Sequence, residues 1–236
     1  MQAGDGPETR LTEREAIPAQ VAARRAVVAV VYATPGTVLE DIHRAMVLAG
    51  AAEHLNPSFP TLLKINISWQ HWYPACSTTP WQLEGVIKSL QRLGHRELIP
   101  AQNGTVVVDS FEGEVKNKHK AVLDRYNLTS IHLDTPPNRW VEYKPKAKML
   151  VLDDIFPEGI QIPETFAGKN IIHLPTMKTH VFTTMTGAMK NAFGGLLHRK
   201  RHWTHSVIHE TLVDLLAIQK EIHPGIFAVM DGTFAG

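Results

Sequence analysis

The segment Thr61-Leu-Leu-Lys-Ile-Asn-Ile67 has the length and the apolar character of a buried β-strand. A loop rich in aromatic residues and proline follows it and ends at Thr79-Pro80, where a threonine cap precedes a proline in the first helical position. This signal predicts a helix over residues 81–93, which Gly94 ends. A strand that leads into a helix in this way is typical of a parallel sheet covered by helices.

The same alternation continues in both directions along the chain. Further strands are predicted at residues 27–32, 105–108, 149–152, 170–174 and 226–230, and further helices at residues 37–49 and 206–221. We therefore expect an α/β fold, with a single three-layer domain over residues 26–236 and a mainly parallel or mixed sheet that is incomplete at its C-terminal edge. Residues 1–25 carry charges without apolar periodicity, which is typical of a flexible leader.

The composition argues against several classes of protein. The 236 residues carry a net charge of +1, which gives no global reason to expect nucleic-acid binding. No apolar run approaches the roughly 18 residues that a membrane-spanning helix needs. Cys76 is the single cysteine, so the chain forms no internal disulfide and supplies no all-cysteine zinc or iron–sulfur site. We expect a cytoplasmic protein without a membrane partner.

The first candidate binding residues are Lys64 and Asn66, which end the strand at residues 61–67 and precede the predicted helix start at Thr79. In open α/β sheets, ligands bind beyond the carboxyl ends of the strands, where helix N-termini offer free N–H groups to anions. A lysine and an asparagine at that edge suit a phosphate or a carboxylate. The alternative is that Thr79 only caps its helix and that Lys64 is solvated.

The second group lies within residues 165–209, which contain no aspartate or glutamate but hold six Lys/Arg and six of the 13 histidines. The central part of this stretch runs Lys178-Thr-His180, then Thr186-Gly-Ala-Met-Lys-Asn191, then Gly194-Gly195. It lacks the residue order of a Walker A loop. Its charged, amide and hydroxyl groups alternate with glycines that let a backbone approach a ligand.

Each of these residues has a predicted role. Thr186 is expected to cap a helix whose first turn presents the N–H group of Gly187, while Lys190 adds a positive charge. His180 is the candidate acid or base, because an imidazole titrates near neutral pH. The full predicted ligand-binding set is Lys64, Asn66, Thr79, Lys178, Thr186, Gly187, Lys190, Asn191 and Gly194. The alternative is a capped helix in a basic patch.

Three further patterns leave alternatives open. His205 and His209 are four residues apart on one face of a predicted helix, a spacing that can chelate a metal. The cations at residues 199–201 oppose a divalent ion, so the alternative is a helix-start histidine in a patch that attracts phosphate. The same cations can contact nucleic acid, but three of them without a wider basic excess give this interpretation little support. Asp231 follows the last predicted strand and is the candidate second base, or orienting partner, for His180.

Four separated motifs together resemble the DUF362 family, roughly over residues 60–236. The motifs are Lys64-x-Asn66 with Thr79-Pro80, Leu174-Pro-x-x-Lys178-Thr-His180, Thr186-Gly-Ala-Met-Lys190-Asn191-x-Phe-Gly194, and Asp231-Gly232. The family is widespread in bacteria and archaea and has no settled reaction. The resemblance implies an α/β fold in which the lysine, histidine, threonine, lysine–asparagine and aspartate positions gather at one site.

The chain departs from the family in two respects. Some members are fused to ferredoxin-like iron–sulfur modules, which a chain with one cysteine does not contain, so electron transfer here would need a separate redox partner. Relatives continue through a Gly-x-Gly-Pro turn where this chain ends, and we therefore expect a C-terminal truncation. The sequence predicts a protein that binds a small anionic metabolite or cofactor of unknown identity and performs acid–base chemistry with it. The alternative is a non-catalytic cofactor-binding or maturation factor for a redox enzyme.

Overall fold

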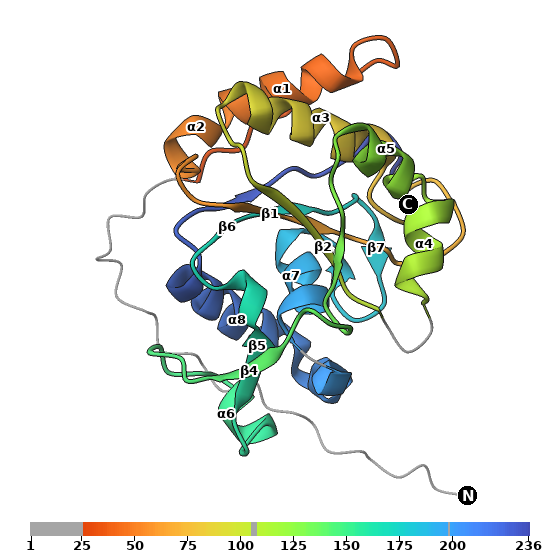
Figure 1. Ribbon diagram of the computed structural model, residues 1–236. Coiled ribbons are helices and arrows are strands. Elements are labelled where there is room, and N and C mark those ends of the chain that lie inside the picture. The colour runs from red at the N-terminus through yellow and green to blue at the C-terminus, as the bar shows by residue number, and fades with distance from the viewer. Residues whose placement is uncertain (1–25, 105–107, 198) are drawn as a thin grey trace, which may run out of the picture.

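A parallel sheet forms the centre of the computed structural model, which describes residues 26–104, 108–197 and 199–236 (Figure 1). Within these residues five strands pair in the order β3-β2-β1-β6-β9, and every pairing is parallel. The strands are β1 (Thr61–Ile65), β2 (Leu98–Gln102), β3 (Ile131–His132), β6 (Asn170–Leu174) and β9 (Ile226–Ala228). The predicted leader at residues 1–25 and most of the predicted strand at residues 105–108 lie outside the described residues.

Helices cover both faces of the sheet, which confirms the predicted three-layer α/β fold (Figure 1). One face carries α1 (Val38–Leu48), α2 (Ala51–His54), α3 (Pro80–Arg92) and α5 (His119–Arg125), with α4 (Ser110–Lys116) next to α5. The other face carries α7 (Ala188–Leu196) and α8 (Ile208–Ile222). The layer of α7 and α8 also includes the hairpin of β4 (Trp140–Tyr143) and β5 (Ile160–Pro163), together with α6 (Leu152–Ile155). Shorter elements are η1 (Glu164–Phe166), η2 (Arg199–Val207), β7 (Thr179–His180) and β8 (Thr184–Met185). None of the helices in the described part of the chain has the length and apolarity that a membrane span requires.

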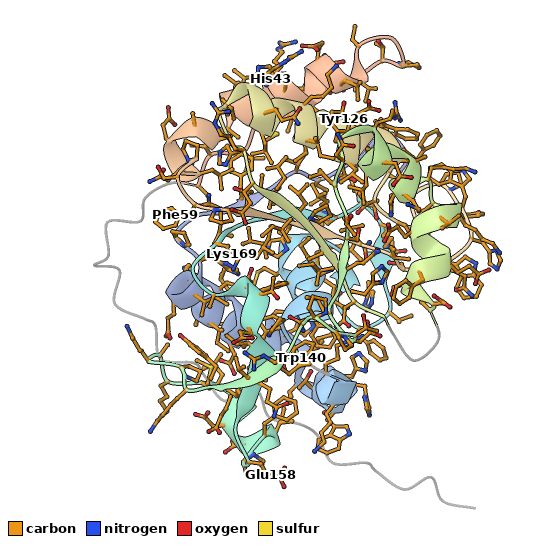
Figure 2. The ribbon with its side chains drawn as sticks, in the orientation of Figure 1. His43, Phe59, Tyr126, Trp140, Glu158 and Lys169 are labelled. Atoms are coloured by element: carbon orange, nitrogen blue, oxygen red, sulfur yellow. The ribbon has the colours of Figure 1, made fainter. Side chains whose placement is uncertain are left out.

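Local signals place the start of α3 as the sequence predicts. Thr79 Oγ1 accepts a hydrogen bond from the backbone N–H of Gln82 at 3.2 Å, and Gln82 Oε1 accepts one from the N–H of Thr79 at 3.3 Å. This reciprocal capping box satisfies N–H groups that have no partner inside the helix. Side chains fill the space between α3 and its neighbours, and the hydroxyl of Tyr126 at the end of α5 donates to Glu84 Oε1 of α3 at 3.1 Å (Figure 2).

The central strand β1 contributes to the cores on both faces of the sheet. Leu63 and Ile65 belong to the apolar cluster that includes α1, α3 and α5, whereas Leu62 belongs to the cluster that includes α7 and α8. Successive side chains of a strand point to opposite faces, so Lys64 shares the face of Leu62 and lies on the α7 side. This alternation directs a lysine into the protein interior.

The predicted strand at residues 27–32 is wrong. These residues form no strand, and Val28 and Tyr32 are 81% and 94% exposed. Their alternating valines have the local preference for a strand, but a strand also requires the backbone groups of a partner. In the described residues β3 and β9 are the sheet edges, and neither pairs with this segment.

The predicted strand at residues 149–152 is also wrong, because a single helical turn, α6, begins at Leu152. The buried carboxylate of Asp214 on α8 accepts hydrogen bonds from the backbone N–H groups of Leu150, Val151 and Leu152, at 2.7 to 3.1 Å. A distant carboxylate thus takes the donors that a neighbouring strand would use. The apolar pattern of this segment carries no sign of that interaction.

Candidate functional site

A cavity of about 890 Å³ lies at the carboxyl ends of the strands, and we refer to it as the carboxyl-edge cavity. Its lining comes from the residues that follow four parallel strands, β1, β2, β3 and β6, and from α7 and η2. This is the position at which open α/β sheets bind their ligands. The volume is within the usual range for small-molecule sites.

The structure brings most of the predicted site residues together here. The predicted residues that line the carboxyl-edge cavity are Lys64, Asn66, Lys178, His180, Thr186, Gly187, Lys190, Asn191 and Gly194. They come from the end of β1 and from the segment between β6 and the last turn of α7, which are far apart in the sequence. Their predicted role in ligand binding remains a prediction.

Helix α7 presents one face to the cavity. Gly187, Lys190, Asn191 and Gly194 recur at the three- and four-residue spacing that places side chains on the same side of an α-helix. The amide of Asn191 donates from Nδ2 to the carbonyl of Lys64 at 2.8 Å, which fixes α7 against the end of β1. The helix therefore holds its first turn, with its positive dipole end, at the cavity wall.

Thr186 does not cap α7, contrary to the prediction. The cap position is occupied by Gly187, which has no side chain to accept a hydrogen bond. The hydroxyl of Thr186 instead donates to the carbonyl of Thr176 at 2.7 Å. The first N–H groups of α7 therefore donate no hydrogen bond to a capping side chain.

Lys64 is buried, with 3% of its surface exposed. Its Nζ donates to the carbonyl of Ile65 at 2.6 Å. Its aliphatic stem lies against Gly195, where an added Cβ would come within 2.4 Å of Lys64 Cε. Burial lowers the pKa of Lys64 to about 7, and the positive charges of Arg201 and Lys190 act in the same direction.

The other cations of the cavity also lie close to one another. Lys178 donates to Ser68 Oγ at 2.6 Å and to the carbonyl of Cys76, and burial lowers its pKa. Lys190 lies 4.4 Å from the centre of the Phe193 ring, and its pKa falls to about 8 through burial and then through Arg201 and Lys178. These cations destabilise one another's charges, and a bound anion would relieve that repulsion.

Negative charge is scarce around these cations. Among the described residues that line the cavity, Asp134 is the one acidic side chain, against four lysine and arginine side chains. Within the described part of the chain, Lys64, Lys178 and Lys190 form no ion pair with a carboxylate. Lysine and arginine side chains therefore outnumber carboxylates among the described residues that line the cavity.

His180 lines the cavity as a neutral imidazole. Burial, followed by the charges of Lys190 and Lys178, lowers its pKa below the usual value. The backbone N–H of Phe182 donates to His180 Nδ1 at 3.2 Å, which places the proton of the neutral ring on Nε2. In this tautomer the ring offers an N–H donor, rather than a lone pair, to a ligand.

The structure does not bring Thr79 and Asp231 into the cavity lining. Thr79 Oγ1 donates to Asp231 Oδ2 at 2.5 Å, and the indole N–H of Trp81 donates to the same oxygen at 3.1 Å. The backbone N–H of Thr233 donates to the second carboxylate oxygen at 2.8 Å. These contacts connect the start of α3 to the end of the chain, so both residues have a structural role here, and their predicted place in a functional site remains a prediction.

The predicted helical pair of His205 and His209 is wrong. Residues 199–207 form the 3₁₀ helix η2, and α8 begins at Ile208, so the two histidines do not share one α-helix. His205 lines the cavity and stacks on Phe182, with ring centres 4.5 Å apart, whereas His209 is exposed. No group of three or more histidine, cysteine or acidic side chains in the described residues is arranged to hold a metal ion.

Several lining residues carry no sequence motif that marked them as members of this site. They are Ser68, Asn103, Gly104, Asp134, Phe182, Arg201, His202 and His205. Asn103 and Asp134 follow β2 and β3 in loops, so only the parallel order of the strands brings them here. Arg201 and His205 lie within residues 165–209, the stretch without acidic residues. That composition is the one sequence signal that could have placed them in the predicted site. Arg201 donates to the carbonyl of Gly104 at 2.8 Å, which joins η2 to the loop after β2.

The fold and the cavity together define a class of protein: an α/β domain with a cationic cavity at the carboxyl edge of a parallel sheet. A family model described as a domain of unknown function, DUF362, matches residues 61–236, so the chain belongs to this family. The resemblance inferred from the four motifs is thereby confirmed. No curated protein and no solved structure matches the chain. Family membership assigns neither a ligand nor a reaction.

Proposed function

We propose that this protein binds a small metabolite or cofactor with phosphate or carboxylate groups in the carboxyl-edge cavity. One observation carries the proposal: four lysine and arginine side chains face one carboxylate among the described lining residues. Burying several cations together is costly unless a counter-charge accompanies them. An anionic ligand supplies that counter-charge.

Each lining residue offers the anion a different kind of group. Lys178 provides charge from the segment that leads into α7, Lys190 provides it from the first turn of α7, and Arg201 adds a planar donor group suited to phosphate or carboxylate. The first turn of α7 after Gly187 adds N–H groups and the positive end of the helix dipole. These groups favour an anion over a neutral molecule of the same size.

His180 is the proposed proton donor. Its Nε2–H can form a hydrogen bond to a bound ligand, and its imidazole can exchange a proton once an anion offsets the neighbouring cations. The alternative of a non-catalytic cofactor-binding or maturation factor uses the same anion site without turnover. The His180→Gln variant distinguishes the two. In a carrier the variant should leave anion binding intact and no activity is lost, whereas in an enzyme it should lower turnover. A cytoplasmic location and a separate redox partner remain predictions from the sequence.

Thermal unfolding in the presence of phosphate, pyrophosphate and citrate tests the anion site. A ligand at a hundred times its Kd stabilises the native protein by about 2.7 kcal/mol. We expect Lys190→Ala and Lys178→Ala to lose most of this stabilisation. Lys220→Ala is the matched control, since Lys220 is exposed on α8 and does not line the cavity. Equal ligand-induced shifts in the wild type and all three variants would contradict the proposal.

A further inference from the structure

Lys64 differs from the other cations of the cavity in its position. It lies near the end of β1, the middle strand of the sheet, and pairs in register with Ala101 on one side and His173 on the other. Its stem passes along Gly195 of α7, and Lys64 is one of the residues that line the carboxyl-edge cavity. Lys64 thus places a buried lysine in the wall of the proposed anion site.

The surroundings of this amine favour its neutral form. His173 on β6 is buried, and burial lowers its pKa to about 3, so it is uncharged at neutral pH. Lys190 on α7 and Arg201 on η2 oppose a positive charge on Lys64. Within the described residues no carboxylate forms an ion pair with Lys64 that would stabilise its ammonium form.

Simple anion binding does not account for this arrangement. A lysine that serves as a phosphate anchor works as a fully charged ammonium, and Lys178, Lys190 and Arg201 already supply charge. A desolvated lysine beside other cations is instead the arrangement that makes an amine nucleophilic near neutral pH. The neutral amine retains a lone pair while one of its N–H bonds points to the carbonyl of Ile65.

We propose that Lys64 is a nucleophile that forms a Schiff base with a small carbonyl compound bearing a carboxylate or a phosphate. This inference rests on the proposed function, because Lys178, Lys190 and Arg201 would hold the anionic group. The lone pair of Lys64 Nζ forms a bond to the carbonyl carbon, and the carbonyl oxygen takes up a proton. That first proton comes from the amine, a second proton from solvent lets the oxygen leave as water, and the protonated C=N bond forms while His180 Nε2–H donates a hydrogen bond to the departing oxygen.

The reaction needs no oxidant or reductant, since an amine and a carbonyl give an imine and one water molecule. The protonated imine withdraws electrons from the adjacent carbon and makes its C–H bonds more acidic. It therefore supplies a chemical reason for an acid–base residue such as His180 in the same cavity. The negative charge of the substrate offsets the positive charge of the imine beside Lys190 and Arg201.

Borohydride trapping of the purified full chain tests this proposal. The protein is incubated at neutral pH with pyruvate or with dihydroxyacetone phosphate and then reduced, and the modified lysines are mapped by mass spectrometry. We expect a mass gain equal to the carbonyl compound less one oxygen atom, located at Lys64. At pH 7 the neutral fraction of Lys64 exceeds that of an ordinary lysine by about a thousandfold, so labelling of Lys64 should exceed that of the exposed Lys220 by at least about tenfold.

The controls separate this inference from the anion site itself. The Lys64→Met variant should lose the specific label, and Lys64→Arg provides a second variant that keeps a positive charge. If neither variant folds, peptide mapping of the wild type alone decides between Lys64 and other lysines. Label spread evenly over exposed lysines, or no label while phosphate still stabilises the protein, would overturn the Schiff base but leave the anion site. The absence of both label and phosphate stabilisation would overturn both proposals.

Discussion

Replacing Lys64 with methionine should stabilise the ligand-free protein, and by an amount that depends on pH. The pKa of Lys64 falls from 10.5 in the unfolded chain to about 7 in the native protein. Between these values the unfolded state binds more protons than the native state, so native stability rises with pH across this window. A shift of this size corresponds to about 5 kcal/mol, of which about 4 kcal/mol opposes folding at pH 7 and about 1 kcal/mol at pH 9.5.

Methionine has a similar length and no charge, so it can occupy the space beside Gly195 without that penalty. Local relaxation and water entry reduce such penalties, so we expect Lys64→Met to exceed the wild type by up to about 4 kcal/mol at pH 7. The advantage should shrink by up to about 3 kcal/mol at pH 9.5.

Urea denaturation followed by tryptophan fluorescence measures this difference at both pH values, in buffers without phosphate, because a bound anion would mask the penalty. Lys220→Met, at an exposed position on α8, is the matched control and should change little. A Lys64→Met variant that is less stable than the wild type at pH 7 would refute the reasoning. So would a stability difference that is independent of pH.

Three further predictions concern the same region. Gly195→Ala should destabilise the protein by about 1–3 kcal/mol and weaken anion binding, because its Cβ would displace Lys64. The control Gly194→Ala places its Cβ in open space and should keep or slightly raise stability. Equal changes in stability for the two variants, measured by calorimetry, would contradict this prediction. Asp231→Ala leaves three donors without their acceptor and should cost about 1–3 kcal/mol in urea titrations while sulfate binding persists; a folded variant that binds no sulfate would instead place Asp231 in the site. Sulfate keeps a constant charge near neutral pH, so its affinity by titration calorimetry should fall as pH rises through about 7 to 8, where Lys64 and Lys190 lose protons; a flat profile would count against these lysines.

Sequence patterns predict the fold correctly where the signal is local. Thr79-Pro80 predicts the start of α3 because a cap acts within one turn of its own residue. The patterns fail where a distant partner decides the outcome. The valines at residues 27–32 have no strand beside them, and the N–H groups at residues 150–152 are taken by Asp214 on another helix.

In the candidate site, too, local patterns are predicted correctly and contacts with distant partners are not. The motif residues from Lys178 to Gly194 are close in sequence, and their spacing is enough to predict that they share one site. Asp231 carries an equally suggestive pattern, yet it lies outside the cavity lining and accepts the hydroxyl of Thr79. A pattern records which groups are present but not which partner satisfies them.

Residue order and composition are sufficient to establish the α/β class, the family and the concentration of cationic residues after β6. The burial of Lys64 along Gly195, with Arg201 and Lys190 near it, follows from the tertiary structure alone. Caps, periodicity and composition depend on residues that are neighbours in the chain. Burial, repulsion between charges and the pKa of an amine depend on distances through space, which the order of the strands in the sheet sets.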